Sequence, residues 1–503
     1  MLILWILSGA LLFLIAFCIF WTWNFRYWKK RGVPGPDPSI LYGNTKSLVA
    51  EKTSVAYEFD KYYREYYGKA PFIGVYVLRS PHILAIDPDF VKFVLVENFK
   101  QFYNNYISDM ATTKSEPYIG HSPFLLKDTD WKDTRTQWGP AFTSGKMKAL
   151  YPILENTCQK MSDFLRLEIA NKSKDGVHFR DVSARFTTEV VIDSIFGIEA
   201  GTFTNNDIPL CDLGARFLDC FENVVNFFIL TAILPILKHL RCFWIITKNI
   251  GKSFEDLMKK GMQFRSESNI VRNDFLSFIM DLGSKQNLSL TQMTSHALTV
   301  YLDGYETTSI TIPLVLYELG RNMEAQEKLR EEIIRFESNS GINYESIQEM
   351  QYLDQVVNET MRIHPPLIII SKLCTENVTY PVNGKNVMIP KGMTVHIPIF
   401  SIHRNENNFQ NPEQFIPERF DEANGGSKVF KDKCSFLPFG NGPRICLGMR
   451  FALLQVKTSV VEVIRQYRVT VNERTKQPLK LDVGQFFSYP RHGIYLNLEP
   501  VKA

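Results

Sequence analysis

The sequence predicts a mainly helical α+β fold with small β-sheets, joined to a membrane by one N-terminal helix. Long stretches with helical periodicity dominate the chain, for example residues 291–336. The runs FIGVYVL and HILAID, near residues 72–87, are rich in β-branched and aromatic residues and predict strands. The chain has 503 residues, 45% of them apolar, and no Gly/Ser linker, repeat or low-complexity tract divides it. We therefore expect one large globular unit with a substantial core.

Residues 1–23 predict a transmembrane signal-anchor. Residues 2–23 are uncharged, and these about 22 residues make about 33 Å of helix, enough to cross a bilayer. A cleaved signal peptide is the alternative, but its apolar region would be shorter and would end at a site of small residues. Four basic residues follow the apolar run closely and none precedes it, so we expect the rest of the chain to face the cytosol.

Residues 24–45 predict a hinge linker, because Pro34, Gly35, Pro36 and Pro38 disfavour helix and stiffen the chain. Residues 46–503 then form the main domain. A second apolar region, 224–246, is interrupted by proline and by polar residues before it reaches spanning length. Either it dips into one leaflet of the membrane or it is a buried core helix, because apolar content alone does not separate the two.

Charge and cysteine usage exclude several classes of protein. The chain has 57 basic and 53 acidic residues, and the formal charge of +4 is too small to indicate a nucleic-acid partner. The eight cysteines are scattered without CxxC pairs, so neither a zinc site nor a disulfide framework is predicted. We expect them to be reduced thiols of a cytosolic domain.

The most informative segment is FGNGPRICLG, residues 439–448. Its glycines do not form a dinucleotide fingerprint, because Ile445 stands where the third glycine is needed, and no phosphate-binding loop fits. The pattern favours a tight turn around Cys446, with amide N–H groups directed at its sulfur and a helix that begins near Gly448. Such a site is expected to favour the thiolate, the form that binds metals. The alternative is a buried cysteine in a glycine-rich turn.

This loop resembles the haem-binding signature of the cytochrome P450 family, F-x-x-G-x-R-x-C-x-G, at Phe439, Gly442, Arg444, Cys446 and Gly448. The resemblance implies the P450 haem-thiolate fold for residues 46–503. It also implies a haem b cofactor, iron protoporphyrin IX, with Cys446 as the axial metal ligand that pushes electron density toward bound oxygen.

Two helical motifs upstream also resemble the family. WKDTRTQW matches W-x-x-x-R, which implies that Trp131 and Arg135 bind one haem propionate while Arg444 binds a propionate from the other side. Taken alone, this pattern also fits a solvated helix face. NETMR and PERF resemble the Glu-Arg-Arg cluster of the family, which comprises Glu359, Arg362 and Arg419 here. Its implied task is structural, locking the core behind the thiolate loop.

DGYETT, residues 303–308, resembles the oxygen-activating motif of the family, with Glu306 and Thr307 as the catalytic acid and alcohol. Splitting O₂ on haem requires the delivery of two protons while bulk water is excluded. A hydroxyl group supported by a carboxylate can deliver these protons. We also expect the Thr307 hydroxyl to bond back to the carbonyl of Asp303. The alternative is that Glu306 and Thr307 are ordinary capping or core residues without a catalytic role.

Two positions depart from the family pattern. Asp303 replaces the usual small residue and places a carboxylate almost over the haem. Three interpretations remain open. Asp303 forms an ester with a haem methyl, as a glutamate does in the fatty-acid-hydroxylating branch of the family. Alternatively, it is a polar or charge-selecting side chain, or it is turned into the helix packing. Lys372 stands where many relatives place an arginine or histidine for a propionate.

The resemblance implies a membrane-bound monooxygenase that inserts one oxygen atom of O₂ into hydrophobic small molecules. The chain holds no NADPH or flavin motif, so electrons from NADPH are expected through NADPH-cytochrome P450 reductase, with cytochrome b5 as a further partner. The motifs look most like insect microsomal P450s of the detoxifying type. This indicates the endoplasmic reticulum membrane, and xenobiotics or insecticides as substrates. A hormone- or fatty-acid-metabolising P450 and a non-catalytic haem-thiolate sensor are the alternatives.

Two surfaces of the protein follow from this assignment. A basic patch for the acidic face of the reductase is expected near the thiolate side, with Lys146, Lys148, Lys431, Lys433 and Arg450 as candidates. Ordinary solvated charge is the alternative for each of them. Substrate specificity is expected in variable loops around residues 103–125, 204–245 and 484–489.

Overall fold

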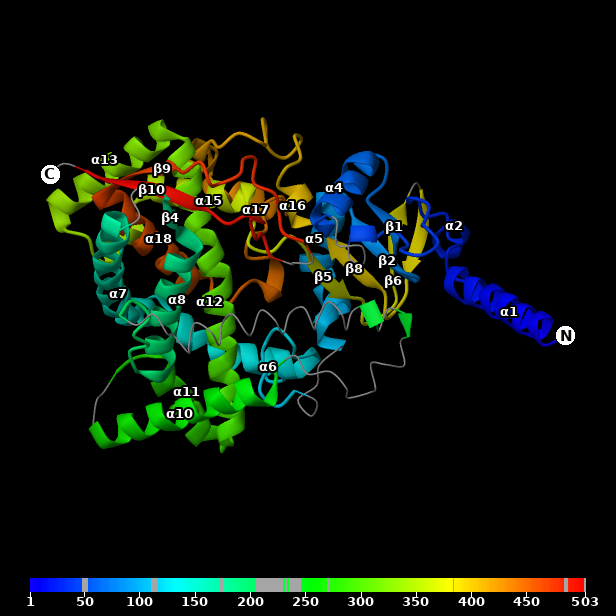
Figure 1. Cartoon of the computed structure of the whole chain (residues 1–503), viewed down its shortest axis with the longest axis horizontal. Helices are drawn as coiled ribbons and strands as arrows, with labels where there is room; N and C mark the ends of the chain where they lie inside the picture. Colours follow the sequence, from blue (N-terminus) through cyan, green and yellow to red (C-terminus); the bar gives the residue numbers. More distant parts are fainter. Residues whose placement is uncertain are drawn as a thin grey trace.

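The computed structural model describes residues 1–47, 53–109, 116–171, 175–204, 229–230, 233–234, 246–268, 272–382, 384–483 and 487–501. Figure 1 shows most helices gathered in one part of the molecule and strands β1, β2, β5, β6 and β8 in another. Helix α12 runs through the helical part, and α1 projects away from the body at the sheet end. The predicted α+β fold is confirmed.

The α-helices are α1 (Leu2–Thr22), α2 (Tyr27–Lys30), α4 (Val55–Tyr66), α5 (Pro88–Lys92), α6 (Asp128–Trp138), α7 (Ser144–Asn171), α8 (Phe179–Phe196), α10 (Lys248–Ser268), α11 (Phe275–Gln286), α12 (Leu290–Arg321), α13 (Met323–Ser340), α14 (Tyr344–Glu349), α15 (Gln351–Ile363), α16 (Ile399–Ile402), α17 (Gly426–Asp432) and α18 (Met449–Gln466). Short 3₁₀ and π turns are η1 (Phe93–Glu97), η2 (Phe99–Phe102), η3 (Tyr106–Asp109), η4 (Gly139–Phe142), η6 (Pro417–Phe420), η7 (Glu422–Asn424) and η8 (Gly442–Arg444).

The strands are β1 (Phe72–Val77), β2 (Ser80–Ala85), β3 (Asn104–Asn105), β4 (Val177–His178), β5 (Ile370–Leu373), β6 (Val378–Val382), β7 (Lys385–Ile389), β8 (Thr394–Ile397), β9 (Tyr467–Val471) and β10 (Tyr495–Pro500). The largest sheet has the order β1-β2-β8-β5-β3, and its β2–β8 pair is parallel while the other pairs are antiparallel. The sheet β4-β10-β9 and the hairpin β6-β7 complete the set. The predicted strands near residues 72–87 are confirmed as the hairpin β1-β2.

Helix α12 is the central element, about 48 Å long and buried along most of its length against α8, α10 and α18. Ser289 and Gln292 form a capping box at its start. Pro313 has no N–H for the carbonyl of Ser309, one turn back, and the Ser183 hydroxyl donates to that carbonyl instead, at 2.6 Å. The bond ties α8 to α12 where the helix pattern is interrupted.

The stretch predicted to be helical over residues 291–336 is helical and consists of two helices. Helix α12 ends at Arg321 and α13 begins at Met323, with Asn322 between them at φ −120° and ψ 75°. The Asn322 side chain donates to the carbonyl of Glu318 at 2.7 Å, satisfying a C-terminal group of α12. Apolar periodicity continues across this break, so the sequence pattern conceals it.

Helix α1 agrees with the predicted anchor, and among the described residues it alone is long and apolar enough to cross a membrane. Its last turn meets the body where Trp21 packs on Leu78, with Ile229 and Ile233 beside them. Most of the predicted region 224–246 lies outside the described residues. The predicted linker 24–45 lies against β1, where the Trp28 indole N–H donates to the carbonyl of Val75 at 3.2 Å.

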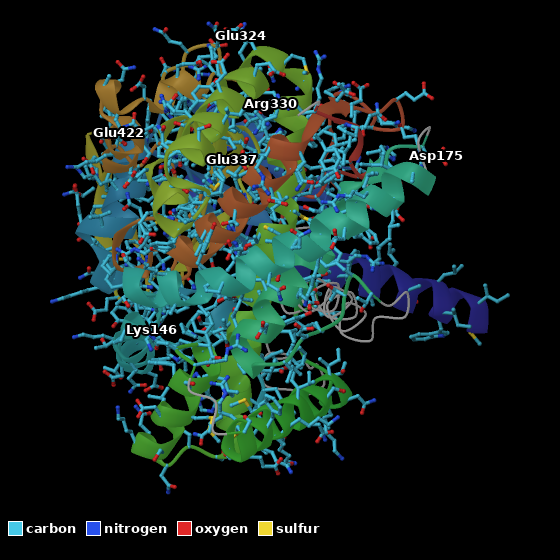
Figure 2. All side chains as sticks on the ribbon, turned by 90° about the vertical axis from the view of Figure 1, so that its left-hand side faces the viewer. Lys146, Asp175, Glu324, Arg330, Glu337 and Glu422 are labelled. Carbon is cyan, nitrogen blue, oxygen red and sulfur yellow. The ribbon has the colours of Figure 1, made fainter. Side chains whose placement is uncertain are left out.

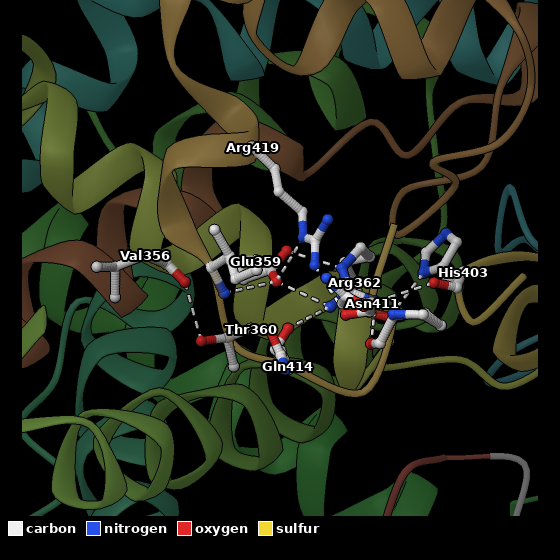
Figure 3. Close-up of polar contacts among 10 residues, drawn as sticks. Val356, Glu359, Thr360, Arg362, His403, Asn411, Gln414 and Arg419 are labelled. Atoms are coloured by element: carbon white, nitrogen blue, oxygen red, sulfur yellow. Dashed lines mark hydrogen bonds and ion pairs between the residues drawn. The ribbon is translucent and has the colours of Figure 1, made fainter. Parts of the chain in front are cut away.

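A buried charge cluster joins α15 to the segment that leads to the cysteine loop (Figure 3). Glu359 and Arg362 have 0% side-chain exposure, and Arg362 donates two bonds, of 2.7 and 2.8 Å, to the Glu359 carboxylate. Arg419 and the Ile416 N–H bind the same carboxylate at 3.2 and 2.9 Å. The remaining Arg362 donors bind the carbonyls of His403, Pro412 and Gln414. The predicted Glu-Arg-Arg cluster is therefore present, with every charge partnered.

His403 connects this cluster to the cysteine loop. Its ring Nδ1 lies 3.2 Å from the carbonyl of Arg362, and its Nε2 accepts from the Leu437 N–H at 2.7 Å. Burial lowers the pKa of His403 to about 3, so the ring stays neutral and keeps a lone pair for that N–H. Leu437 lies two residues before the loop, so the cluster fixes where the loop begins.

Replacing Glu359 by alanine is expected to lower the free energy of unfolding by about 3–5 kcal/mol. The substitution leaves Arg362 and Arg419 as buried cations without their carboxylate. Urea unfolding of the haem-loaded enzyme, followed by tryptophan fluorescence, measures the change.

Glu337→Ala is the matched control, because Glu337 pairs with Arg465 on the outer surface at 3.0 Å and is 44% exposed (Figure 2). An exposed pair contributes about 1 kcal/mol or less. Equal effects of the two substitutions would show that the buried cluster does not stabilise the fold.

Candidate active site

A cavity of about 460 Å³ lies between α12, the cysteine loop and the β5 end of the main sheet. Cys446 and Thr307 line it, and so does Asp303. Cys446 and Asp303 lie deep inside the protein and yet open into this cavity, which makes them accessible from within it. Apolar side chains make up most of the wall, which suits a flat hydrophobic cofactor and an apolar substrate.

The cysteine loop is closed by its own backbone. The Cys446 N–H donates to the carbonyl of Phe439 at 2.9 Å, and the Asn441 side chain caps the turn η8 by accepting from Gly442 at 2.7 Å. Gly442 has φ +69°, and a Cβ there would collide with the carbonyl oxygen of Leu95. Helix α18 begins at Met449, with Gly448 as its N-cap, so the predicted helix start is confirmed.

The loop alone does not ionise the cysteine, which corrects the expectation from sequence. Burial raises the pKa of Cys446 to about 11, and the negative charge of Asp303 contributes to the same direction. The Gly448 N–H and the Arg135 cation act in the opposite sense, but more weakly. The loop therefore shapes a position for sulfur, and a bound metal cation has to supply the charge that makes it a thiolate.

The predicted propionate ligands Trp131, Arg135 and Arg444 meet at the wall of the same cavity. The Arg444 guanidinium carbon lies 4.3 Å from the centre of the Trp131 ring, and that of Arg135 lies 5.8 Å from it. Arg444 donates to the carbonyls of Tyr103, Pro123 and Leu126 at 3.0, 2.8 and 2.8 Å.

A guanidinium has five N–H groups, so Arg444 keeps two for an anion. No carboxylate of the described chain pairs with Arg135, which leaves its charge available. Lys372 is 1% exposed, lines the cavity and donates to Asn105 at 3.1 Å. Burial, together with the nearby Arg444, holds the pKa of Lys372 well below its usual range, so an anion beside Lys372 would favour its charged form. Three basic side chains without a carboxylate partner in the described structure therefore converge where a dianionic cofactor would place its charges.

The predicted bond between Thr307 and Asp303 is confirmed, because the Thr307 hydroxyl donates to the Asp303 carbonyl at 2.9 Å. The Thr311 hydroxyl makes the same bond one turn later, to the carbonyl of Thr307, at 2.7 Å. Each bond draws a side chain onto the helix backbone and offers the carbonyl a second donor. The Thr307 side chain remains on the cavity wall.

Glu306 is not paired directly with Thr307, because adjacent residues of a helix point about 100° apart. Glu306 is 3% exposed, and its Oε1 accepts from Arg180 of α8 at 2.8 Å. Arg180 also contacts the hydroxyls of Tyr489, at 2.6 Å, and Ser309. The second carboxylate oxygen, Oε2, is buried without a hydrogen bond. Burial raises the pKa of Glu306, and Arg180 opposes that rise.

Sequence reasoning missed Arg180, Ser309 and Tyr489. Arg180 stands at the start of a helix, in HFRDVSARF, where an arginine is unremarkable. Tyr489 falls in the predicted specificity loop 484–489, of which 484–486 lie outside the described residues. A buried carboxylate needs a cation as its partner. A prediction that Glu306 is buried could therefore have prompted a search for Arg180.

The comparison with known proteins agrees with this geometry. A family model described as cytochrome P450 matches residues 33–498. The chain belongs to the cytochrome P450 family. The protein named "Probable cytochrome P450 28a5" of Drosophila melanogaster is 37% identical over 95% of this chain and 96% of its own length. Cytochrome P450 6A1 of Musca domestica and cytochrome P450 6j1 of Blattella germanica are each 30% identical over 96% of this chain and 95% of their own.

This P450 is a haem-thiolate monooxygenase, and the residues present fit a haem. The cavity provides one sulfur ligand at Cys446 and apolar walls. Three basic side chains without carboxylate partners among the described residues, Arg135, Lys372 and Arg444, suit two propionates. The position of each is known from the structure, and the assignment of each to a propionate stays a prediction.

Replacing Arg180 by glutamine is expected to raise the pKa of Glu306 further, because the carboxylate then loses its only cationic partner in the described structure. The measurement is a pH titration of the protonated carboxyl band by infrared difference spectroscopy, with Glu306→Gln as the subtraction.

Arg166→Gln is the control, since Arg166 pairs with Asp163 at the surface, where both side chains are more than half exposed. A Glu306 titration that is the same in Arg180→Gln and in the unmodified enzyme would contradict the electrostatic coupling.

Proposed function

We propose that this P450 oxidises hydrophobic foreign compounds at the endoplasmic reticulum membrane, with electrons from NADPH delivered by NADPH-cytochrome P450 reductase. The observation that carries the proposal is the apolar cavity onto which Cys446 and Thr307 both open. A largely apolar wall with few polar groups binds small hydrophobic molecules. The resemblance to insect detoxifying P450s favours xenobiotics or insecticides over a hormone or a fatty acid.

The described residues divide the work as follows. Cys446 ligates the iron, and Trp131, Arg135 and Arg444 hold the propionates, with Lys372 beside them. Haem supplies O₂ binding and one-electron chemistry when it is bound. The chain supplies the proton route: Thr307 presents a hydroxyl to the cavity, and Glu306 is the adjacent acid, held by Arg180. The apolar wall excludes bulk water from this route.

The decisive experiment is turnover of a panel of hydrophobic compounds with NADPH and the reductase. We expect oxidised products that depend on both NADPH and O₂. Cys446→Ser is the matched control: it should lose the red-shifted Soret band of the reduced, CO-bound enzyme together with turnover, because an alcohol stays protonated where a thiol ionises. Haem binding without turnover of any compound would favour the sensor alternative.

Thr307→Ala is expected to keep haem and to consume NADPH at a similar rate, but to divert electrons from product to hydrogen peroxide. The hydroxyl that orders proton delivery at the cavity is lost, while the cavity itself is kept. The ratio of product to NADPH consumed should fall about tenfold or more. Thr311→Ala removes the equivalent hydroxyl one turn later and serves as the control. Full coupling in Thr307→Ala would contradict the assignment.

Electron transfer requires a face for the reductase, and cytochrome b5 is proposed as a second partner. The structure describes all five candidate cations of that face. Lys148 forms an exposed ion pair with Glu345, Lys146 contacts Asn273 at the start of α7 (Figure 2), and Lys431 lies 6.0 Å from the ring centre of Phe436. Arg450 donates to the carbonyl of Phe142 at 3.3 Å, and Lys433 is exposed. Lys146, Lys433 and Arg450 therefore have no acidic partner among the described residues, whereas Lys148 has one.

Membrane attachment is proposed to rest mainly on α1. Removal of residues 2–23 is expected to weaken sedimentation with membranes without abolishing it, because Ile229 and Ile233 lie beside the end of the anchor. Carbonate washing of the membrane pellet measures attachment. Complete solubility after truncation would show that the 224–246 region does not touch the bilayer.

A further inference from the structure

The carboxyl group of Asp303 has no partner among the described residues that line the cavity. It lies on α12 one turn before Thr307, and its side chain opens into the cavity. No hydrogen bond or ion pair joins it to another side chain of the described residues, whereas Glu306, three residues on, is bound by Arg180. Asp303 therefore faces the space that a ligand enters, which excludes the interpretation of a side chain turned into the helix packing.

Among the described residues, no arginine or lysine compensates the charge of Asp303. Burial raises the pKa of Asp303 to about 7, and no described arginine or lysine acts to lower it. Arg135, in contrast, is close enough to Cys446 to affect the pKa of both groups. Arg135 thus acts on the cysteine, and none of Arg135, Lys372 and Arg444 acts on the carboxyl of Asp303.

An uncompensated carboxyl in an apolar cavity is costly, because desolvation disfavours its charged form. A ligand that carries a positive charge removes this cost, since it supplies the missing counterion and is itself desolvated next to an anion. A neutral ligand leaves the carboxyl as it is. The position next to Thr307 means that such a ligand would hold its charged group close to the reaction centre.

We propose that Asp303 selects cationic amines as substrates of this enzyme by pairing with the ammonium group inside the cavity. The apolar wall holds the remainder of the molecule, so the preferred ligand is a hydrophobic compound with one ammonium group. This inference rests on the proposed function, because it names the substrate class of the same cavity.

The test uses two ligands of the same shape that differ in charge, benzyltrimethylammonium and its carbon isostere neopentylbenzene. The quaternary nitrogen has no lone pair, so it cannot ligate the haem iron and confuse the measurement. Binding to the haem-loaded enzyme is measured by the ligand-induced shift of the Soret band. The ratio of the two dissociation constants, compared between variants, cancels the partitioning of the ligands into detergent.

Asp303→Asn should weaken benzyltrimethylammonium binding about tenfold, which corresponds to about 1.4 kcal/mol, and leave neopentylbenzene binding nearly unchanged. Asp303→Glu keeps the charge and should keep most of the preference for the ammonium ligand. The substrate panel should shift in Asp303→Asn from amines toward neutral compounds.

Two results would overturn the inference. The first is an equal effect of Asp303→Asn on both ligands, which would show that the residue acts through shape. The second is haem that stays with the protein on denaturing chromatography after turnover and becomes extractable in Asp303→Ala, because an esterified carboxyl carries no charge. The binding ratio needs no turnover, so an enzyme inactive toward the whole panel would count against the proposed function and still test Asp303.

Discussion

The pairing of the buried Glu359 carboxylate with Arg362 and Arg419 is the interaction on which the site depends. One carboxylate accepts from donors of two segments, α15 and residues 416–419, and the spare donors of Arg362 reach the carbonyls of His403, Pro412 and Gln414. The hydrogen bonds within the cysteine loop set its shape, and its position relative to the rest of the protein needs contacts with other segments. Neutral His403 transmits the restraint to Leu437, which fixes the loop that carries Cys446.

The need of a buried charge for a partner also distinguishes two carboxyl groups of α12, those of Asp303 and Glu306. Glu306 and Asp303 are three residues apart, and burial raises the pKa of both side chains. Glu306 has a guanidinium partner from α8, and Asp303 has none among the described residues. A buried charge that is paired with an opposite charge of the protein can stabilise the fold or take part in a proton route. An unpaired charge that faces a cavity is a candidate for binding an oppositely charged ligand. The contrast arises on one helix, so it reflects neighbours and not local backbone structure.

The sequence allowed the prediction of those features that depend on local chemistry. The turn around Cys446, the start of α18 and the bond from Thr307 to Asp303 all follow from residues close together in the chain. The partnership of Arg180 with Glu306 and Tyr489 could not be predicted, because it joins distant segments that carry no spacing signal. The pKa of Cys446 was also inaccessible, since the local amide groups were visible in the sequence but the depth of burial was not.

The cavity cations and Asp303 together determine what the loaded enzyme can accept. If the propionates of the cofactor bind Arg135, Lys372 and Arg444 as predicted, these residues offer no attraction to an anionic substrate. Ionisation of Cys446 adds a second negative charge to the cavity. Asp303 is near enough to that sulfur to raise its pKa. A carboxylate ligand entering this space would meet an unpaired Asp303 and would bind at an electrostatic cost. On the proposed role of Asp303, loading the cofactor is therefore expected to strengthen the preference for neutral and cationic molecules, because the propionates would neutralise the positive charges of the described cavity.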